Sequence, residues 1–128
     1  MKYMTAAQAV QLIESGDSIY IQGSTSVPEV LSQALADRGN ELKDVTVYAA
    51  FAVGRCEAPY CRPEYKDAFN VKSLFVANNV RRWLADGYGS TIPAFLGEIP
   101  GLFRDGTLPV DAVCLNVSPP NDEGYCSF

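Results

Sequence analysis

The residues best placed for chemistry form the turn GSTSVP at positions 23–28. A predicted strand precedes this turn and a predicted helix follows it, with Pro28 at the first helical position. Backbone N–H groups and the hydroxyls of Ser24, Thr25 and Ser26 therefore gather at a helix N-terminus beside the carboxyl ends of strands, where open α/β sheets bind ligands. Gly23 permits close approach of a ligand to the backbone.

The turn is neither a P-loop nor a dinucleotide fingerprint, because it lacks both GKS and GxGxxG. The alternative is a simple turn in which a Ser or Thr side chain caps the helix. Glu29 favours this alternative slightly, because its charge competes with any anion bound at the helix start. Both interpretations stay open on the sequence.

The cysteines and acids indicate no second reaction centre. Cys56 and Cys61 are spaced more widely than a zinc knuckle, and the chain contains no His, which excludes a mixed zinc site and His-based catalysis. We expect free reduced thiols, no metal and no cofactor. Glu98 has apolar neighbours and is a candidate for a partly buried acid, although a helix cap or a structural hydrogen bond is the simpler role. The other acids occupy turns and strand edges.

The elements that must position these residues alternate along the chain. Apolar periodicity and turn residues predict strands at residues 18–22, 45–50, 71–77, 91–96 and 110–117, and helices at 5–15, 28–38, 80–87 and 99–106. Thr5 is the expected cap of the first helix, and Asn78 or Asn79 that of the third. The second helix has its apolar stripe at Val30, Leu31, Ala34 and Leu35. This alternation predicts an α/β fold, a mainly parallel sheet with helices on both faces. Residues 51–70 form a long connection without a sustained period, and loops of that length are often functional.

Composition limits the class of protein. The chain has 128 residues, about one domain, of which 48% are apolar and 20% charged, so we expect a folded core. A net charge of -5 argues against a nucleic-acid partner. No apolar run is long enough for a membrane span and the N-terminus lacks a signal peptide, so we expect a cytoplasmic protein without a membrane partner.

Three long stretches and the spacing between them resemble one known family. They are LIESGDSIYIQGSTSVPEVLSQAL, APYCRPEY and the segment from NVRRWLADGYGS through the EIP, LP and VSPP runs to GYCSF. Together they resemble the N-terminal domain of the acetyl-CoA hydrolase/transferase family, which includes acetate, succinate and 4-hydroxybutyrate CoA-transferases. The likeness covers nearly the whole chain. It departs from the family pattern at Gly97, at Asn78-Asn79 and at Asp122-Glu123, which leaves the substrate open.

The resemblance implies two similar α/β domains with the acyl-CoA and carboxylate site between them. It places the attacking glutamate in a C-terminal domain, so we expect this chain to be an inactive front part that binds acyl-CoA and a small carboxylate only with that missing domain. Coenzyme A is then a substrate. A domain without its packing partner exposes apolar surface, so we expect the chain to self-associate as a homo-oligomer. The substrate-facing residues carried over are those of the turn and of the loop after the second strand: Gly23, Ser24, Thr25, Ser26, Pro28, Phe51, Ala52, Val53 and Gly54.

A different class of function also fits the sequence. The chain can be a stand-alone, non-catalytic α/β module that binds a small acid, an acyl-CoA or a protein. A reading frame that continues well past Phe128 favours the enzyme, and a stop codon there favours the module.

Overall fold

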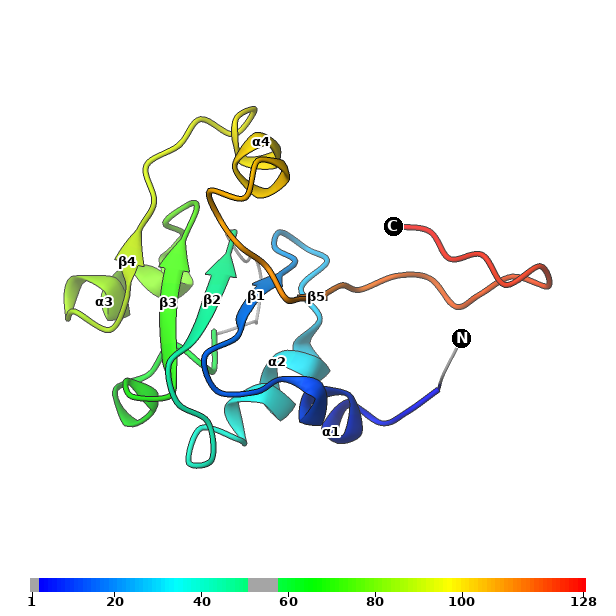
Figure 1. Cartoon of the computed structure of the whole chain (residues 1–128), viewed down its shortest axis with the longest axis horizontal. Coiled ribbons are helices and arrows are strands. Elements are labelled where there is room, and N and C mark those ends of the chain that lie inside the picture. The colour runs from blue at the N-terminus through cyan, green and yellow to red at the C-terminus, as the bar shows by residue number, and fades with distance from the viewer. Residues whose placement is uncertain (1–2, 51–57) are drawn as a thin grey trace.

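Five parallel strands form one sheet in the order β4-β3-β2-β1-β5 (Figure 1). The structure is a computed structural model, and it describes residues 3–50 and 58–128. All four strand pairings are parallel, which confirms the predicted α/β fold. The strands are β1 (Ser18–Ile21), β2 (Val45–Ala49), β3 (Phe69–Ser73), β4 (Ser90–Thr91) and β5 (Ala112–Cys114).

Helices cover both faces of the sheet, as predicted. They are α1 (Ala6–Ala9), the 3-10 turn η1 (Val10–Leu12), α2 (Glu29–Ala36), the 3-10 turn η2 (Pro63–Tyr65), α3 (Asn78–Ala85) and α4 (Ile99–Arg104). Successive strand residues point to opposite faces, so β1 sends Ile19 and Ile21 into the core shared with η1, α2 and α3. Tyr20 points the other way and meets Phe103 of α4 edge-on, with ring centroids 5.5 Å apart.

The element boundaries correct several predictions. The first helix ends early: α1 stops at Ala9 and η1 at Leu12, although Thr5 caps the start through a capping box with Gln8, as its sequence predicts. Strand β3 begins and ends earlier than predicted. Strands β4 and β5 are much shorter than predicted, because each lies at a sheet edge and has a ladder partner on one side only.

Two helix predictions are also wrong in detail. Val30 was placed on the buried stripe of α2, but it is 74% exposed, because the buried positions are Ser32, Leu35 and Ala36 on another face of the helix. The N-cap of α3 is Ala77, with no side-chain cap, so neither Asn78 nor Asn79 caps that helix. Cap chemistry alone therefore placed the start of α3 too late.

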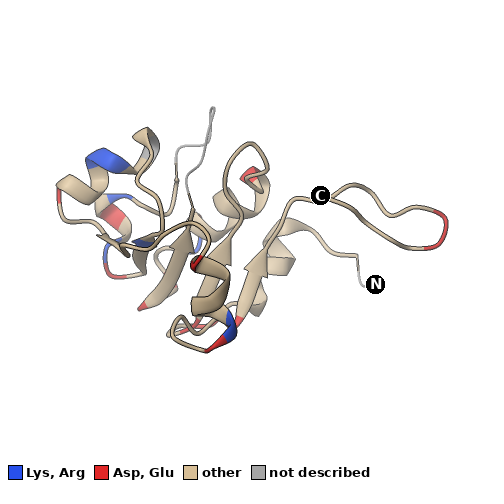
Figure 2. Cartoon of the chain, turned by 90° about the horizontal axis from the view of Figure 1, so that it is seen from above, with Lys and Arg blue, Asp and Glu red and all other residues tan. Residues whose placement is uncertain are grey.

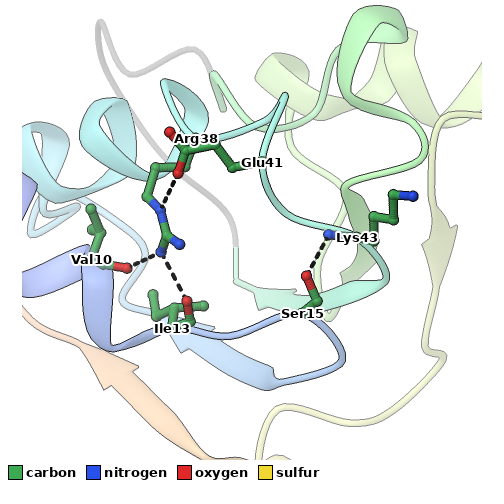
Figure 3. Close-up of polar contacts among 6 residues, drawn as sticks. All are labelled: Val10, Ile13, Ser15, Arg38, Glu41 and Lys43. Carbon is green, nitrogen blue, oxygen red and sulfur yellow. Dashed lines mark hydrogen bonds and ion pairs between the residues drawn. The ribbon is translucent and has the colours of Figure 1, made fainter.

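Arg38, just after α2, ties the N-terminal segment to the body of the domain (Figure 3). Its guanidinium donates to the carbonyl oxygens of Val10, which also accepts from Ile13 N–H within η1, and of Ile13, the residue that follows η1. Its Nε also lies 3.2 Å from a carboxylate oxygen of Glu41. A second link joins the same regions, where Lys43 N–H donates to Ser15 Oγ over 3.0 Å. These contacts hold α1 and η1 beside α2.

The last residues form a hairpin that projects beyond the sheet, with acidic residues at its tip (Figure 2). Its two arms are joined by hydrogen bonds from Ser118 N–H to Ser127 O, 2.8 Å, and from Asn121 N–H to Tyr125 O, 2.9 Å. Phe128 is 88% exposed. Over the part of the chain that the structure describes, we find no helix with the length and apolar character of a membrane span.

Candidate functional site

The strand order creates a topological switch point between β1 and β5. From β1 the chain moves outward through β2 and β3 to β4, and then returns across the sheet to place β5 on the free side of β1. The connections on either side of β1 therefore run to opposite faces: α2 packs with the core on one face and α4 with the cluster on the other. Ligands of open α/β sheets bind in the crevice outside such a point, at the carboxyl ends of the strands.

A cleft of about 410 Å³ lies at this place. Its two walls come from the turn and first residues of α2, which follow β1, and from the residues just after β5. The lining residues are Thr25, Val27, Pro28, Glu29, Val30, Leu31, Leu115 and Asn116. Val30, which lies on a face of α2 away from the buried positions, is part of this wall.

Only part of the predicted site lines the cleft. Thr25 and Pro28 do, whereas Gly23, Ser24 and Ser26 belong to the same turn but are not among the lining residues. The predicted residues Phe51, Ala52, Val53 and Gly54 lie outside the described residues. That these residues face a substrate stays a prediction.

The local geometry of the turn differs from the expected one in two ways. Pro28 is the N-cap of α2 and has no capping side chain, so the interpretation in which a Ser or Thr caps this helix is wrong, as is the placement of Pro28 inside the first turn. Ser24, and not the glycine before it, adopts the left-handed conformation, with φ 61. A side chain at such a φ is strained, and the surrounding structure must hold it there.

Gln22 lies where the two walls meet. Its N–H donates to the carbonyl oxygen of Cys114 over 3.0 Å, which extends the pairing of β1 with β5 by one bond. Its side-chain Oε1 accepts from the N–H of Asn116 at 2.7 Å. Both sides of the cleft are therefore attached to this one residue at the point where they leave the sheet.

The chemistry available in the cleft is limited. Glu29 is the single charged residue among the described residues that line it, and its side chain is exposed. Cys114 is adjacent, but burial raises the pKa of its thiol, so the nucleophilic thiolate is disfavoured at neutral pH. The described residues thus form a wall able to hold part of a ligand, without a nucleophile and base in contact.

The remaining candidates have structural roles. Glu98 is exposed and not partly buried, and its Oε2 accepts from Phe95 N–H at 3.2 Å, which is the structural hydrogen bond expected as its simpler role. The thiol of Cys61 is buried and donates weakly to Tyr88 O across 3.6 Å. Within residues 3–50 and 58–128 no three or more Cys, Asp or Glu side chains converge in a way that could hold a metal ion.

Leu115 and Asn116 were missed by sequence reasoning. Both lie just beyond β5, where the sequence continues an apolar run to Val117 and predicts a longer strand. The signal that identifies them is the strand order, because only the position of β5 next to β1 brings them to the turn at 23–28. The apolar pattern of a single segment does not reveal the order of the strands in the sheet.

The curated relatives that match this chain are named as CoA transferases. A family model described as "Acetyl-CoA hydrolase/transferase N-terminal domain" matches residues 1–128. A succinyl-CoA:acetate/propanoyl-CoA:succinate CoA transferase from Fasciola hepatica is 31% identical over 91% of this chain and 24% of its own length. A 4-hydroxybutyrate coenzyme A transferase from Clostridium kluyveri is 31% identical over 99% of this chain and 29% of its own. The chain thus spans less than a third of these relatives.

Solved structures agree with the sequence comparisons. The crystal structure of RipA from Yersinia pestis superposes with a TM-score of 0.84 at 26% identity, over 96% of this chain and 30% of that one. A 4-hydroxybutyrate CoA-transferase from Porphyromonas gingivalis gives a TM-score of 0.73 at 26% identity, over 96% of this chain and 26% of that one. With the family model matching every residue, the chain belongs to the acetyl-CoA hydrolase/transferase family and corresponds to its N-terminal domain.

Proposed function

We propose that this chain is the N-terminal domain of a CoA-transferase that moves CoA from an acyl-CoA to a small carboxylate. The observation that carries the proposal is the match of the family's N-terminal domain to all 128 residues. The curated relatives that match are named as CoA transferases for succinate, acetate, propanoate, 4-hydroxybutyrate, butyrate or cyclohexane carboxylate. All these acceptors or acyl groups are carboxylic acids, so a carboxylate acceptor is the common chemistry.

The reaction proceeds through a covalent enzyme intermediate. A glutamate carboxylate attacks the thioester carbonyl of the acyl-CoA, which gives an acyl-glutamyl anhydride and CoA thiolate. The thiolate attacks the glutamyl carbonyl and releases the first carboxylate, leaving a glutamyl-CoA thioester. The second carboxylate attacks this thioester, and the same two steps in reverse transfer CoA to it. We assign the glutamate to the part of the relatives that this chain does not cover.

The role of this domain in that reaction is to form one wall of the substrate site. The cleft between the turn and the exit of β5 lies at the switch point, and its lining combines apolar side chains with the hydroxyl of Thr25 and the amide of Asn116. Such a wall suits a short acyl group and one polar end. The negative charge of Glu29, in the lining of the cleft, repels a carboxylate bound nearby. We therefore place the acyl chain of the substrate in this cleft and its carboxylate towards the domain that this chain does not cover.

A domain replacement tests this proposal. The 128 residues take the place of the matching N-terminal region in the 4-hydroxybutyrate coenzyme A transferase of Clostridium kluyveri, which they match over 29% of its length. We expect the folded chimera to transfer CoA from acetyl-CoA to 4-hydroxybutyrate or to another small carboxylate. Hydroxylamine added during turnover traps the glutamyl thioester as a hydroxamate, and mass spectrometry locates it outside residues 1–128.

The chimera must be compared with a matched control. A Lys43→Ala chimera changes an exposed residue outside the cleft lining and should retain full activity. A chimera that folds as a soluble, cooperative unit and transfers CoA to none of the carboxylates would contradict the proposal. Activity with a trapped intermediate inside residues 1–128 would instead overturn the assignment of the nucleophile.

A further inference from the structure

Strand β5 is attached to the sheet by a short ladder. Only three residue pairs join it to β1: Ile19 with Ala112, Tyr20 with Val113 and Ile21 with Cys114. No other strand of the described residues pairs with it. One further hydrogen bond joins β1 and β5 at each end of this ladder. In both bonds a side-chain oxygen accepts from a backbone N–H of the neighbouring segment.

The two ends differ in what they hold. At the start of the strands, Asp111 Oδ2 accepts from Ser18 N–H at 2.8 Å, on the side of the sheet away from the cleft. At the other end, Gln22 Oε1 accepts from Asn116 N–H at 2.7 Å. After Gln22 the chain turns away into residues 23–28, and Asn116 is itself a lining residue of the cleft. The second bond thus spans the base of the cleft.

We propose that Gln22 is a positioning residue whose side chain sets the spacing between the two walls of the switch-point cleft. The hydrogen bond from Gln22 N–H to Cys114 O fixes the last backbone contact between β1 and β5. The bond between the Gln22 side chain and Asn116 N–H holds the two segments together two residues further along. Ser24 follows in its left-handed conformation, a strained residue that needs fixed neighbours. The importance of this spacing for catalysis rests on the proposed function. The role of Gln22 in setting the spacing is independent of that function.

The test uses the 128-residue chain, labelled with ¹⁵N, and three variants. Gln22→Met keeps the length of the side chain and removes the acceptor. Gln22→Glu keeps an acceptor oxygen at the same place. Asp111→Ala removes the equivalent bond at the opposite end of the strands and serves as the matched control. Amide hydrogen exchange is measured at Asn116 and Ser18, with Val47 in the core as the reference for global opening.

We expect Gln22→Met to accelerate exchange at Asn116 by about threefold to tenfold, the loss of one hydrogen bond, relative to Val47. The amide signals of residues 25–31 should shift in the same variant, because the facing wall moves. Gln22→Glu should restore both readouts. Asp111→Ala should accelerate exchange at Ser18 and leave Asn116 and residues 25–31 unchanged.

Two results would overturn the inference. The first is exchange that rises equally at Asn116 and Val47 in Gln22→Met, since a residue important only for stability acts in that way. The second is faster exchange at Asn116 without any change in the amide signals of residues 25–31. That result would show that the bond exists but does not position the facing wall of the cleft. Neither readout needs turnover, so failure here is distinct from failure of the CoA-transferase proposal.

Discussion

Arg38 and Ile13 connect the end of α2 to the end of η1, with Arg38 Nη1 donating to the Ile13 carbonyl oxygen at 2.8 Å. The Arg38 side chain is only 14% exposed, so this charge-assisted bond lies mostly out of water. Arg38→Met should lower the free energy of unfolding by about 2 kcal/mol, because it leaves the carbonyls of Val10 and Ile13 without this donor. Urea denaturation measures the loss.

The matched control for this prediction is Arg82→Met. Arg82 approaches Asp86 at 3.9 Å with side chains 80% and 52% exposed, so its removal should cost less than about 1 kcal/mol. Equal losses for the two variants would show that the Arg38 contacts add nothing beyond a surface charge.

The turn beside the cleft gives the second prediction. Ser24 has φ 61, a region that glycine enters without strain. Ser24→Gly should therefore raise the free energy of unfolding by about 0.5 kcal/mol, the relief of strain less the greater entropy of an unfolded glycine. Ser26→Gly, at a position without a positive φ, should lower it by a similar amount. Thermal unfolding of both variants decides the sign, and destabilisation by Ser24→Gly would contradict the assigned conformation.

Cys61 gives a pH-dependent prediction. Burial raises the pKa of this thiol from its ordinary value of 9.0 to about 11. The unfolded chain ionises first, so the stability that the buried thiol contributes is complete below pH 9.0 and is lost as the pH rises through about 11. The destabilisation caused by Cys61→Ala should thus be largest near neutral pH and shrink in alkali.

Urea denaturation of the wild type and Cys61→Ala at about pH 8 and about pH 10 tests the difference. Other groups titrate in the same range, and subtracting one protein from the other removes their contribution. A difference between the two proteins that does not change with pH would mean that the Cys61 thiol ionises alike in the folded and unfolded chain.

The chemistry of the isolated chain is the subject of the fourth prediction. The described lining of the cleft contains one carboxylate, Glu29, which is exposed and lies in the first turn of α2. We expect no release of thiol from acetyl-CoA by the 128-residue chain in the presence of acetate, and no difference between wild type and Glu29→Gln. Thiol titration and mass spectrometry provide the readout. Turnover that disappears in Glu29→Gln would move the nucleophile into this domain.

Much of the fold could be predicted from the sequence because the central strands β1 and β2 are short, mostly apolar segments bounded by turn residues. Strands β1 and β2 lie close to their predicted positions, since both of their faces are buried by helices. The edge strands could not be placed as well. Residues 110–117 are nearly as apolar as β2, yet Val113 is 52% exposed, and no strand of the described residues pairs with the free side of β5.

The candidate site could be predicted only in part, for a related reason. The turn at 23–28 was identified because strand, turn and helix follow one another in the sequence. Leu115 and Asn116 are distant in the sequence and join the turn only through the crossover that places β5 beside β1. The strained residue was also missed, because a glycine precedes it and glycine is the usual residue for a left-handed turn position.

The central claim is that the cleft between the turn and the exit of β5 faces the substrate of a CoA-transferase. Hydrogen exchange with mass spectrometry on the chimera, with and without acetyl-CoA, tests it most directly. We predict that acetyl-CoA slows exchange in peptides that contain residues 23–31 and 115–116, and leaves the α3 peptide at 78–85 unchanged. An active chimera in which acetyl-CoA protects other regions but neither of these two segments would contradict the claim.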